Sequence, residues 1–293
     1  MYSVIWTPQH AGTPPNYRQE PLIAKPGDVL MVHTWEPAQR DPSMPVVVLL
    51  HGIGMHGAPY GAVAPYFTDR GYVLIVPDLR GHGQSSGQRG NLPELDVLRC
   101  DLVRVLDHVA ARYPGAGIIL MGESMGGLLA ATLAVDVQPR LAGLSLLAPA
   151  FQVHRSRFMA PMSLSRLMTQ GRIPIVTPSH LQPATRDPRF LEARLKDPLT
   201  LQEVAPGYLL RLFWLGQQWP RLAERLRLPS FMGLAEKDWI VDNAAAQRVL
   251  ERMPERGKVL KLWPEAHHTV FWDPITPTLV TDWDAWVNQQ VRQ

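Results

Sequence analysis

Short, mainly apolar runs recur along the chain, as is typical of strands that are buried on both faces of a parallel sheet. These runs occupy residues 46–50, 72–76, 117–121, 143–148, 229–234 and 258–263. Two weaker strand patterns, 21–24 and 29–35, flank the turn signal Pro26-Gly27-Asp28 and predict a hairpin. The pattern therefore predicts a sheet of eight strands.

Stretches suited to helices lie between these strands. They cover about 58–70, 93–112, 128–135, 243–253 and 276–291, and Pro93 opens the second of them. Strands that alternate with helices at this spacing predict an α/β fold, in which a mostly parallel sheet carries helices on both faces.

The alternation stops after the sixth strand. Residues 150–228 contain no buried-strand run and are rich in Met, Leu, Arg and Pro. We expect this stretch to form a helical cap over the carboxyl ends of the strands, where open α/β sheets bind ligands. The predicted organisation is a core of residues 1–149 and 229–293, with the cap at 150–228.

Composition narrows the class of protein. With 293 residues, 46% apolar and 19% charged, the chain is globular, and a formal charge of +3 without basic runs gives no reason to expect a nucleic-acid partner. The single cysteine, Cys100, excludes an internal disulfide, and we expect it to be a small core residue of helix 93–112. No secretory pattern or membrane-length apolar run occurs, so a cytoplasmic location is expected. Nothing in the sequence indicates an oligomeric state.

The segment Gly122-Glu123-Ser124-Met125-Gly126 has the pattern of a nucleophile elbow. It lies between a predicted strand and a predicted helix, where the turn is so tight that side chains at the glycine positions would collide. The serine then projects its Oγ over the helix N-terminus. We predict Ser124 as a catalytic nucleophile.

A serine hydroxyl needs a base, usually a histidine that is held in one tautomer by a carboxylate. In a sheet of this kind these partners follow later strands, in the order Ser, acid, His. Asp238 is the favoured acid, Glu236 is an alternative, and Asp242 is better explained as a helix N-cap. His267 and His268 are adjacent candidates for the base, and residue chemistry alone does not separate them.

Two backbone N–H groups are expected to form an oxyanion hole. One belongs to Met125, directly after the serine, and the other to Ile53 in a glycine-containing loop. His51 and His56 have no carboxylate at a matching spacing, so no metal site is expected. Arg80 and His82 are expected to brace a turn.

Taken together, these segments resemble the α/β-hydrolase superfamily, and within it the monoacylglycerol lipase and lysophospholipase-like group. The resemblance rests on the motifs at 51–56, 78–87, 122–127 and 238–242 and on the His268 loop. It implies a triad of Ser124, Asp238 and His268, because the family's small-x-His ending matches Ala266-His267-His268. Ala235 and Glu265 depart from the family pattern, which often has glycine at these positions.

We therefore expect a serine ester hydrolase that acts on acyl esters such as monoacylglycerols and needs no cofactor. A lysophospholipase, a thioesterase or a proline-type aminopeptidase would share the same triad. A dehalogenase would need a carboxylate in place of Ser124. A non-catalytic ligand-binding protein on this scaffold is the alternative of a different class.

The composition of the cap bears on the substrate. The cap holds twelve Lys and Arg against five Asp and Glu, which gives about +7 and leaves about −4 for the rest of the chain. One interpretation is an ordinary helical core with a solvated basic face. The other is a lid with an acyl pocket inside and a basic outer face that makes transient contact with anionic lipid, which would make the protein membrane-peripheral. The substrate-binding candidates are Phe158, Met159, Met162, Phe213 and Trp214.

Overall fold

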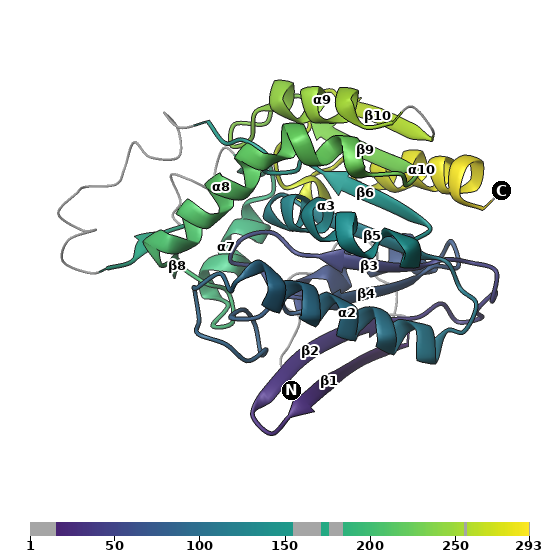
Figure 1. The fold of residues 1–293 in the computed structure, drawn as a ribbon, viewed down its shortest axis with the longest axis horizontal. Coiled ribbons are helices and arrows are strands. Elements are labelled where there is room, and N and C mark those ends of the chain that lie inside the picture. Colours follow the sequence, from purple (N-terminus) through teal and green to yellow (C-terminus); the bar gives the residue numbers. More distant parts are fainter. Residues whose placement is uncertain (1–15, 155–170, 176–183, 255–256, 293) are drawn as a thin grey trace.

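The computed structural model describes residues 16–154, 171–175, 184–254 and 257–292, and its centre is one twisted eight-stranded sheet (Figure 1). The strand order is β1-β2-β4-β3-β5-β6-β9-β10. The strands β4, β3, β5, β6, β9 and β10 run parallel to one another, whereas β2 pairs antiparallel with both β1 and β4. The predicted eight-stranded, mostly parallel sheet is confirmed. The strands are β1 Tyr17–Lys25, β2 Asp28–Trp35, β3 Val46–Leu50, β4 Val73–Pro77, β5 Ile118–Glu123, β6 Gly143–Leu147, β9 Ser230–Ala235 and β10 Lys258–Trp263.

Helices cover both faces of this sheet (Figure 1). One face carries α2, α3 and α9, and the other carries α1 and α10. The helices and helical turns of the core are η1 Ala58–Ala62, α1 Ala64–Thr68, α2 Leu95–Arg112, α3 Met125–Val137, η2 Gln138–Arg140, α9 Asn243–Arg252, η5 Val270–Trp272, α10 Thr276–Trp286 and the π-helical turn η6 Val287–Val291.

Burial on both faces explains why the run of β3 is apolar at every position. In β3, Val46, Val48 and Leu50 belong to the core beneath α2 and α3, whereas Val47 and Leu49 belong to the core beneath α1 and α10. Successive side chains of a strand point to opposite faces, so a strand that is covered on both sides has no position for a polar residue.

Helix α2 differs from its prediction in two respects. It begins at Leu95 rather than at Pro93. Cys100 is exposed, so its expected place in the core is wrong. The buried side of α2 contains Leu98, Leu102 and Val105, and a residue two positions after Leu98 points to the opposite side of an α-helix.

Between β6 and β9 lies the insertion that the sequence predicts as a helical cap. Its described elements are the short strand pair β7 Ile173–Pro174 and β8 Glu203–Val204, the helices α7 Pro188–Lys196 and α8 Pro206–Leu222, and the turn η4 Ala223–Arg225. Helices α7 and α8 lie at the end of the sheet where α3 begins (Figure 1). In the described parts of the chain, no helix combines the length and the apolar composition needed to cross a bilayer.

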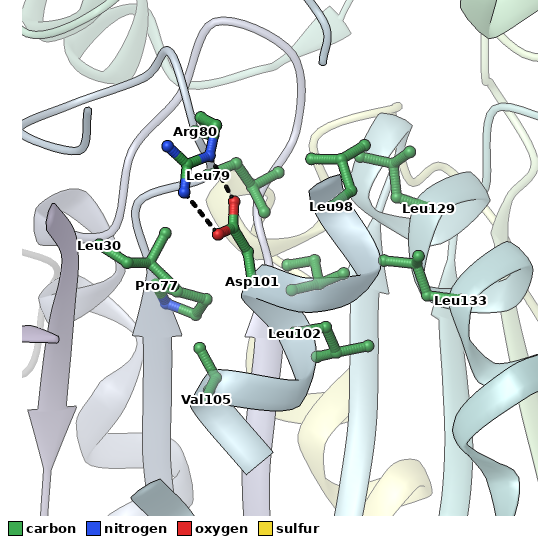
Figure 2. Close-up of a pocket in the computed structure, with 11 residues that line it drawn as sticks. Leu30, Pro77, Leu79, Arg80, Leu98, Asp101, Leu102, Val105, Leu129 and Leu133 are labelled. Carbon is green, nitrogen blue, oxygen red and sulfur yellow. Dashed lines mark hydrogen bonds and ion pairs between the residues drawn. The ribbon is translucent and has the colours of Figure 1, made fainter. Parts of the chain in front are cut away.

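A small cavity of about 20 Å³ lies under α2, lined mainly by leucines of α2, α3 and the neighbouring strands (Figure 2). Arg80 closes one side of it. Its guanidinium donates to both carboxylate oxygens of Asp101 at 2.7 and 2.8 Å and to Asp28 Oδ1 at 2.7 Å. Arg80 therefore joins the start of β2 to α2, a wider role than the predicted bracing of a turn.

Candidate active site

The turn between β5 and α3 places Ser124 at the carboxyl end of the sheet. Its backbone has φ 55° and ψ −117°, a conformation that residues other than glycine rarely adopt. A Cβ on Gly122 would lie 2.2 Å from the Gly126 oxygen, and one on Gly126 would lie 2.0 Å from the Leu50 oxygen. A side chain at either position would collide with a backbone oxygen, so both positions require glycine, as the sequence pattern predicts.

Ser124, His268 and Asp238 form one hydrogen-bonded chain. His268 Nε2 lies 2.8 Å from Ser124 Oγ, and His268 Nδ1 lies 2.7 Å from Asp238 Oδ2. A carboxylate only accepts hydrogen bonds, so the imidazole proton is on Nδ1 and Nε2 is free to accept from the serine hydroxyl. The three groups come from the loops after β5, β10 and β9.

The side chains of Ser124, His268 and Asp238 are fixed by burial and hydrogen bonding. All three residues are buried, and the Oδ1 atom of Asp238 accepts from the backbone N–H groups of Ile240 and Val241 at 2.8 and 2.9 Å. Burial lowers the pKa of His268, but the charge and hydrogen bond of Asp238 and the charge of Glu123 outweigh it, so the pKa lies above its usual 6.5.

The alternative residues lie elsewhere. His267 Nδ1 is 3.1 Å from the carbonyl oxygen of Glu265, within its own loop. Glu236 is exposed. Asp242 accepts from the backbone N–H groups of Ala244 and Ala245 at the start of α9, which confirms it as an N-cap.

The loop after β3 lies directly against the serine. A Cβ on Gly52 would be 3.7 Å from Ser124 Cβ. Within the described part of the chain, the backbone N–H groups of Ile53 and Met125 have no acceptor in the protein. These are the two amides expected to form the oxyanion hole, and both remain available to a substrate oxygen.

A second layer of buried polar groups stands behind this loop. Tyr60 donates to Glu123 Oε2 at 2.8 Å, and the Tyr60 oxygen accepts from the Gly52 N–H at 3.4 Å. Burial raises the pKa of Glu123 to about 7. Burial also lowers the pKa of His51 to about 3, and its Nε2 accepts from the Leu79 N–H.

His82 is buried and faces the cap. Its Nε2 lies 3.0 Å from the hydroxyl of Tyr208 on α8, and that hydroxyl also lies 2.7 Å from Met125 Sδ. Burial lowers the pKa of His82 to about 4. His82 therefore links the cap to the elbow and does more than brace a turn.

The predicted substrate-binding residues of the cap divide into two groups. Phe158, Met159 and Met162 lie outside the described residues. Phe213 and Trp214 lie on α8, pack against each other at a ring-centroid distance of 5.6 Å, and are both exposed. The buried side of α8 carries Tyr208, Leu215 and Trp219 instead, so α8 does not enclose Phe213 and Trp214 in a buried pocket.

Four residues near the site were not predicted from the sequence: Tyr60, Glu123, Arg194 and Tyr208. The position of Glu123 next to the nucleophile was a usable signal for one of them. The two cap residues lie in a stretch without a motif. Across the described ranges, no group of three or more His, Cys, Asp or Glu side chains is placed to hold a metal ion.

Comparison with known proteins gives concordant matches. The family model described as "Serine aminopeptidase, S33" matches residues 41–275. A monoacylglycerol lipase from Mycolicibacterium smegmatis is 28% identical over 275 residues, which cover 92% of this chain and 97% of that protein. A monoglyceride lipase from Rattus norvegicus is 23% identical over 287 residues, which cover 95% and 94%.

A solved structure has the same fold. The crystal structure of a soluble variant of the Saccharomyces cerevisiae monoglyceride lipase, bound to a substrate analogue, aligns with a TM-score of 0.80. The alignment covers 96% of each chain at 20% identity.

Proposed function

Because the chain belongs to the serine aminopeptidase S33 family, we propose that it is a serine ester hydrolase that cleaves monoacylglycerols and related acyl esters. The observation that carries the proposal is the His268 imidazole, 2.8 Å from the Ser124 hydroxyl and 2.7 Å from the Asp238 carboxylate. The relatives named monoacylglycerol and monoglyceride lipase, matched over nearly their whole length, support this substrate class.

In the first half of the reaction, Ser124 Oγ attacks the ester carbonyl carbon while His268 Nε2 takes the hydroxyl proton. Asp238 stabilises the imidazolium that forms. The carbonyl oxygen becomes an oxyanion, for which the free N–H groups of Ile53 and Met125 are the proposed donors. His268 then protonates the departing alcohol oxygen, which leaves an acyl ester on Ser124.

In the second half, His268 removes a proton from a water molecule that attacks the acyl carbonyl. The same two N–H groups hold the second oxyanion. When it collapses, the carboxylic acid is released and the proton returns from His268 to Ser124 Oγ. Every proton transfer uses one imidazole nitrogen, and no cofactor takes part in these steps.

The test is Ser124→Ala. We expect hydrolysis of a monoacylglycerol to fall about a millionfold, by analogy with removal of the nucleophile from other triads. The unsubstituted protein should form a covalent adduct on Ser124 with a fluorophosphonate, and mass spectrometry of the peptide locates it. Near-normal turnover by Ser124→Ala would refute the mechanism, and an unlabelled, inactive parent protein would favour a non-catalytic ligand-binding role.

The family description favours one second candidate, an aminopeptidase with the same triad. A panel of monoacylglycerols, p-nitrophenyl esters of graded chain length, lysophospholipids, acyl thioesters and prolyl peptides separates these activities. We expect the highest kcat/KM for monoacylglycerols. A clear preference for peptides would assign the chain to the aminopeptidases of the family.

The proposal extends to the cap, for which we keep the boundaries 150–228. We propose that its inner side helps to enclose the acyl chain and that its basic outer side makes transient contact with anionic lipid surfaces. Exposed Leu210, Phe213 and Trp214 on α8 support the outer contact. This arrangement fits a cytoplasmic protein that binds transiently to the surface of membranes.

A further inference from the structure

One segment of the cap, Ala184–Leu201, joins two loops of the active site; we call it the cap bridge. At its start, the Ala184 carbonyl accepts from the N–H and the hydroxyl of Thr269 at 2.9 and 2.8 Å. Arg186 pairs with Asp273 at 2.5 Å. Thr269 directly follows the base His268, so this end of the cap bridge is anchored to the histidine loop.

The other end of the cap bridge holds the loop after β3. Arg194 Nη2 donates to the Ile53 carbonyl at 3.0 Å, and the Leu201 N–H donates to the Gly54 carbonyl at 2.9 Å. His56 Nε2 lies 2.6 Å from Asp197 Oδ2. Three contacts from the cap therefore fall within four residues of the loop that carries the Ile53 amide.

Arg194 is the most constrained of these contacts. Only 7% of the residue is exposed, and its guanidinium carbon lies 5.9 Å from the centre of the Phe190 ring. Phe190 stacks on Trp272 at 4.4 Å, and Trp272 meets the ring of Tyr60 at 4.9 Å. This series of rings fixes the guanidinium beside the loop.

The charge of Arg194 is retained in this position. Burial lowers its pKa to about 10, so the guanidinium is protonated at neutral pH. Its Nε atom has no hydrogen-bond partner among the residues that the structure describes. A buried cation is costly unless it is paired or hydrogen-bonded, and this guanidinium donates a hydrogen bond to the backbone carbonyl of Ile53.

We propose that Arg194 is a positioning residue for ester hydrolysis. From its place in the cap, it holds the loop that supplies the Ile53 N–H to the oxyanion. The inference rests on the proposed function, because an oxyanion forms only if Ser124 attacks a carbonyl. A charge-assisted hydrogen bond is about twice as strong as a neutral one. It fixes the Ile53–Gly54 peptide while Tyr60 contacts the Gly52 N–H, and Ile53 N–H lies between these two restraints.

The effect on rate follows from the geometry. One oxyanion donor contributes roughly a hundred- to a thousandfold in kcat, and displacement of a reacting group by an ångström costs on the order of a hundredfold. Loss of the Arg194 restraint leaves the donor in place but less well aimed. We expect kcat to fall about 10- to 100-fold, with KM changed about twofold or less.

The experiment compares Arg194→Met with Arg189→Met. Arg189 lies on the same helix, but its side chain is 61% exposed and pairs with Asp187. Affinities are measured for a substrate-like trifluoromethyl ketone, which forms a tetrahedral oxyanion on Ser124, and for the corresponding secondary alcohol, which cannot. Rates are expressed per site labelled at completion by a fluorophosphonate.

We expect Arg194→Met to weaken ketone binding by the same factor as kcat/KM and to leave alcohol binding unchanged, while Arg189→Met changes neither. Arg194→Lys keeps the charge and should recover part of the loss. Equal losses for ketone and alcohol, or no loss in ketone affinity, would overturn the inference.

Two further outcomes remain distinguishable. If Arg194→Met does not fold, as thermal unfolding would show, Arg194→Lys decides by the same ratio of ketone to alcohol affinity. If the parent protein neither labels at Ser124 nor hydrolyses esters, the proposed function fails first. A fully active parent with an unaffected Arg194→Met contradicts only the role of Arg194.

Discussion

Glu123 is buried and directly precedes Ser124, the proposed nucleophile. It accepts a hydrogen bond from Tyr60, which also contacts the loop after β3 through the Gly52 N–H. Its pKa of about 7 reflects burial, which the hydrogen bond from Tyr60 and the charge of His268 only partly offset. The charge of Glu123 in turn raises the pKa of His268. The two groups therefore influence each other's ionisation in the pH range where the enzyme would work.

Glu123→Gln tests this coupling. Glutamine keeps an acceptor for Tyr60 but removes the charge, so the pKa of His268 should fall. Because the proposed base His268 can take a proton only when it is neutral, the acid limb of kcat/KM against pH should move to lower pH. A pH–rate profile with a monoacylglycerol measures it, and an unmoved or rising limb would contradict the prediction.

The same variant has a stability control with a defined sign. The carboxyl ionises near 4.5 in the unfolded chain and near 7 in the folded protein. The folded state therefore loses stability as the pH rises from 4.5 through 7, by at most about 3 kcal/mol. Glu123→Gln should be more stable than the parent at pH 8, and the difference should shrink at pH 5, as denaturant unfolding can measure.

Ser124 and Asp238 could be selected from the sequence because each follows a buried strand, β5 or β9. His268 follows the edge strand β10, whose side chains are partly exposed. Ser124 has a local signature in its two glycines, and Asp242 is recognisable as a cap because a helix follows. His267 and His268 differ only in the direction that the loop gives them, and that depends on packing against residue 273 and the cap. Glu265, where glycine is frequent in the family, takes a positive φ of 63°, so the departure is accommodated by strain at that turn.

At the scale of elements, Arg80 connects α2 to the start of β2. Its side chain is 15% exposed, and Asp28 and Asp101 are 19% and 8% exposed. Arg80→Met would leave the Asp101 carboxylate facing a cavity lined by leucine (Figure 2) and would remove a partner of Asp28. Arg104 remains 3.6 Å from Asp28 and 3.8 Å from Asp101. We therefore expect the free energy of unfolding to fall by about 2 kcal/mol, less than for a buried charge left without any partner.

Arg99→Met on the same helix is the matched control for that loss. Arg99 is 43% exposed, and its partner Asp96 is 84% exposed, so the expected change is within about 0.5 kcal/mol. Urea unfolding at pH 7 compares the two variants. Equal effects would mean that the position of Arg80 between β2 and α2 has no special weight.

Elements of the core could be predicted because their patterns are local. A strand covered on both faces is mainly apolar, and every predicted run coincides with a strand of the sheet. The prediction for Cys100 was wrong because the position of a residue around the helix, and not its apolar character alone, decides whether it is buried. The cap was less accessible: its short strands β7 and β8 have only two residues each, too few for any periodicity.

For the molecule as a whole, the cap contacts pair residues far apart in the sequence. Arg194 meets Ile53 across 141 positions, and Tyr208 meets His82 across 126. Such pairs have no local pattern, and a single sequence carries no record of which distant positions touch. The sequence therefore indicates that a cap exists and where it begins, but not that it supports the oxyanion loop.

The cap and the rest of the chain carry formal net charges of opposite sign, about +7 for the cap and about −4 for the rest. Its helix α8 exposes Leu210 and Trp214 at 56% and 58%, next to Phe213. An exposed apolar group on a basic element suits the boundary of an anionic bilayer, where apolar side chains enter and Lys or Arg attract the headgroups. We expect the protein to sediment with vesicles that contain phosphatidylglycerol more than with phosphatidylcholine alone, and less at high salt.

Substitutions separate the apolar from the electrostatic part of that binding. Leu210→Ala with Trp214→Ala should lower the partition coefficient about tenfold, since each removes apolar surface that would leave water. Leu260→Ala is the control for the leucine, because Leu260 is also exposed, at 41%, but lies on β10, the edge strand of the sheet, and not on α8. Activity on a water-soluble short-chain ester should be unchanged by each of these three substitutions, because none of them alters a proposed catalytic residue. Vesicle binding that ignores both anionic lipid and salt would remove the electrostatic part, and equal effects of Leu210→Ala and Leu260→Ala would remove the assignment of the contact to α8.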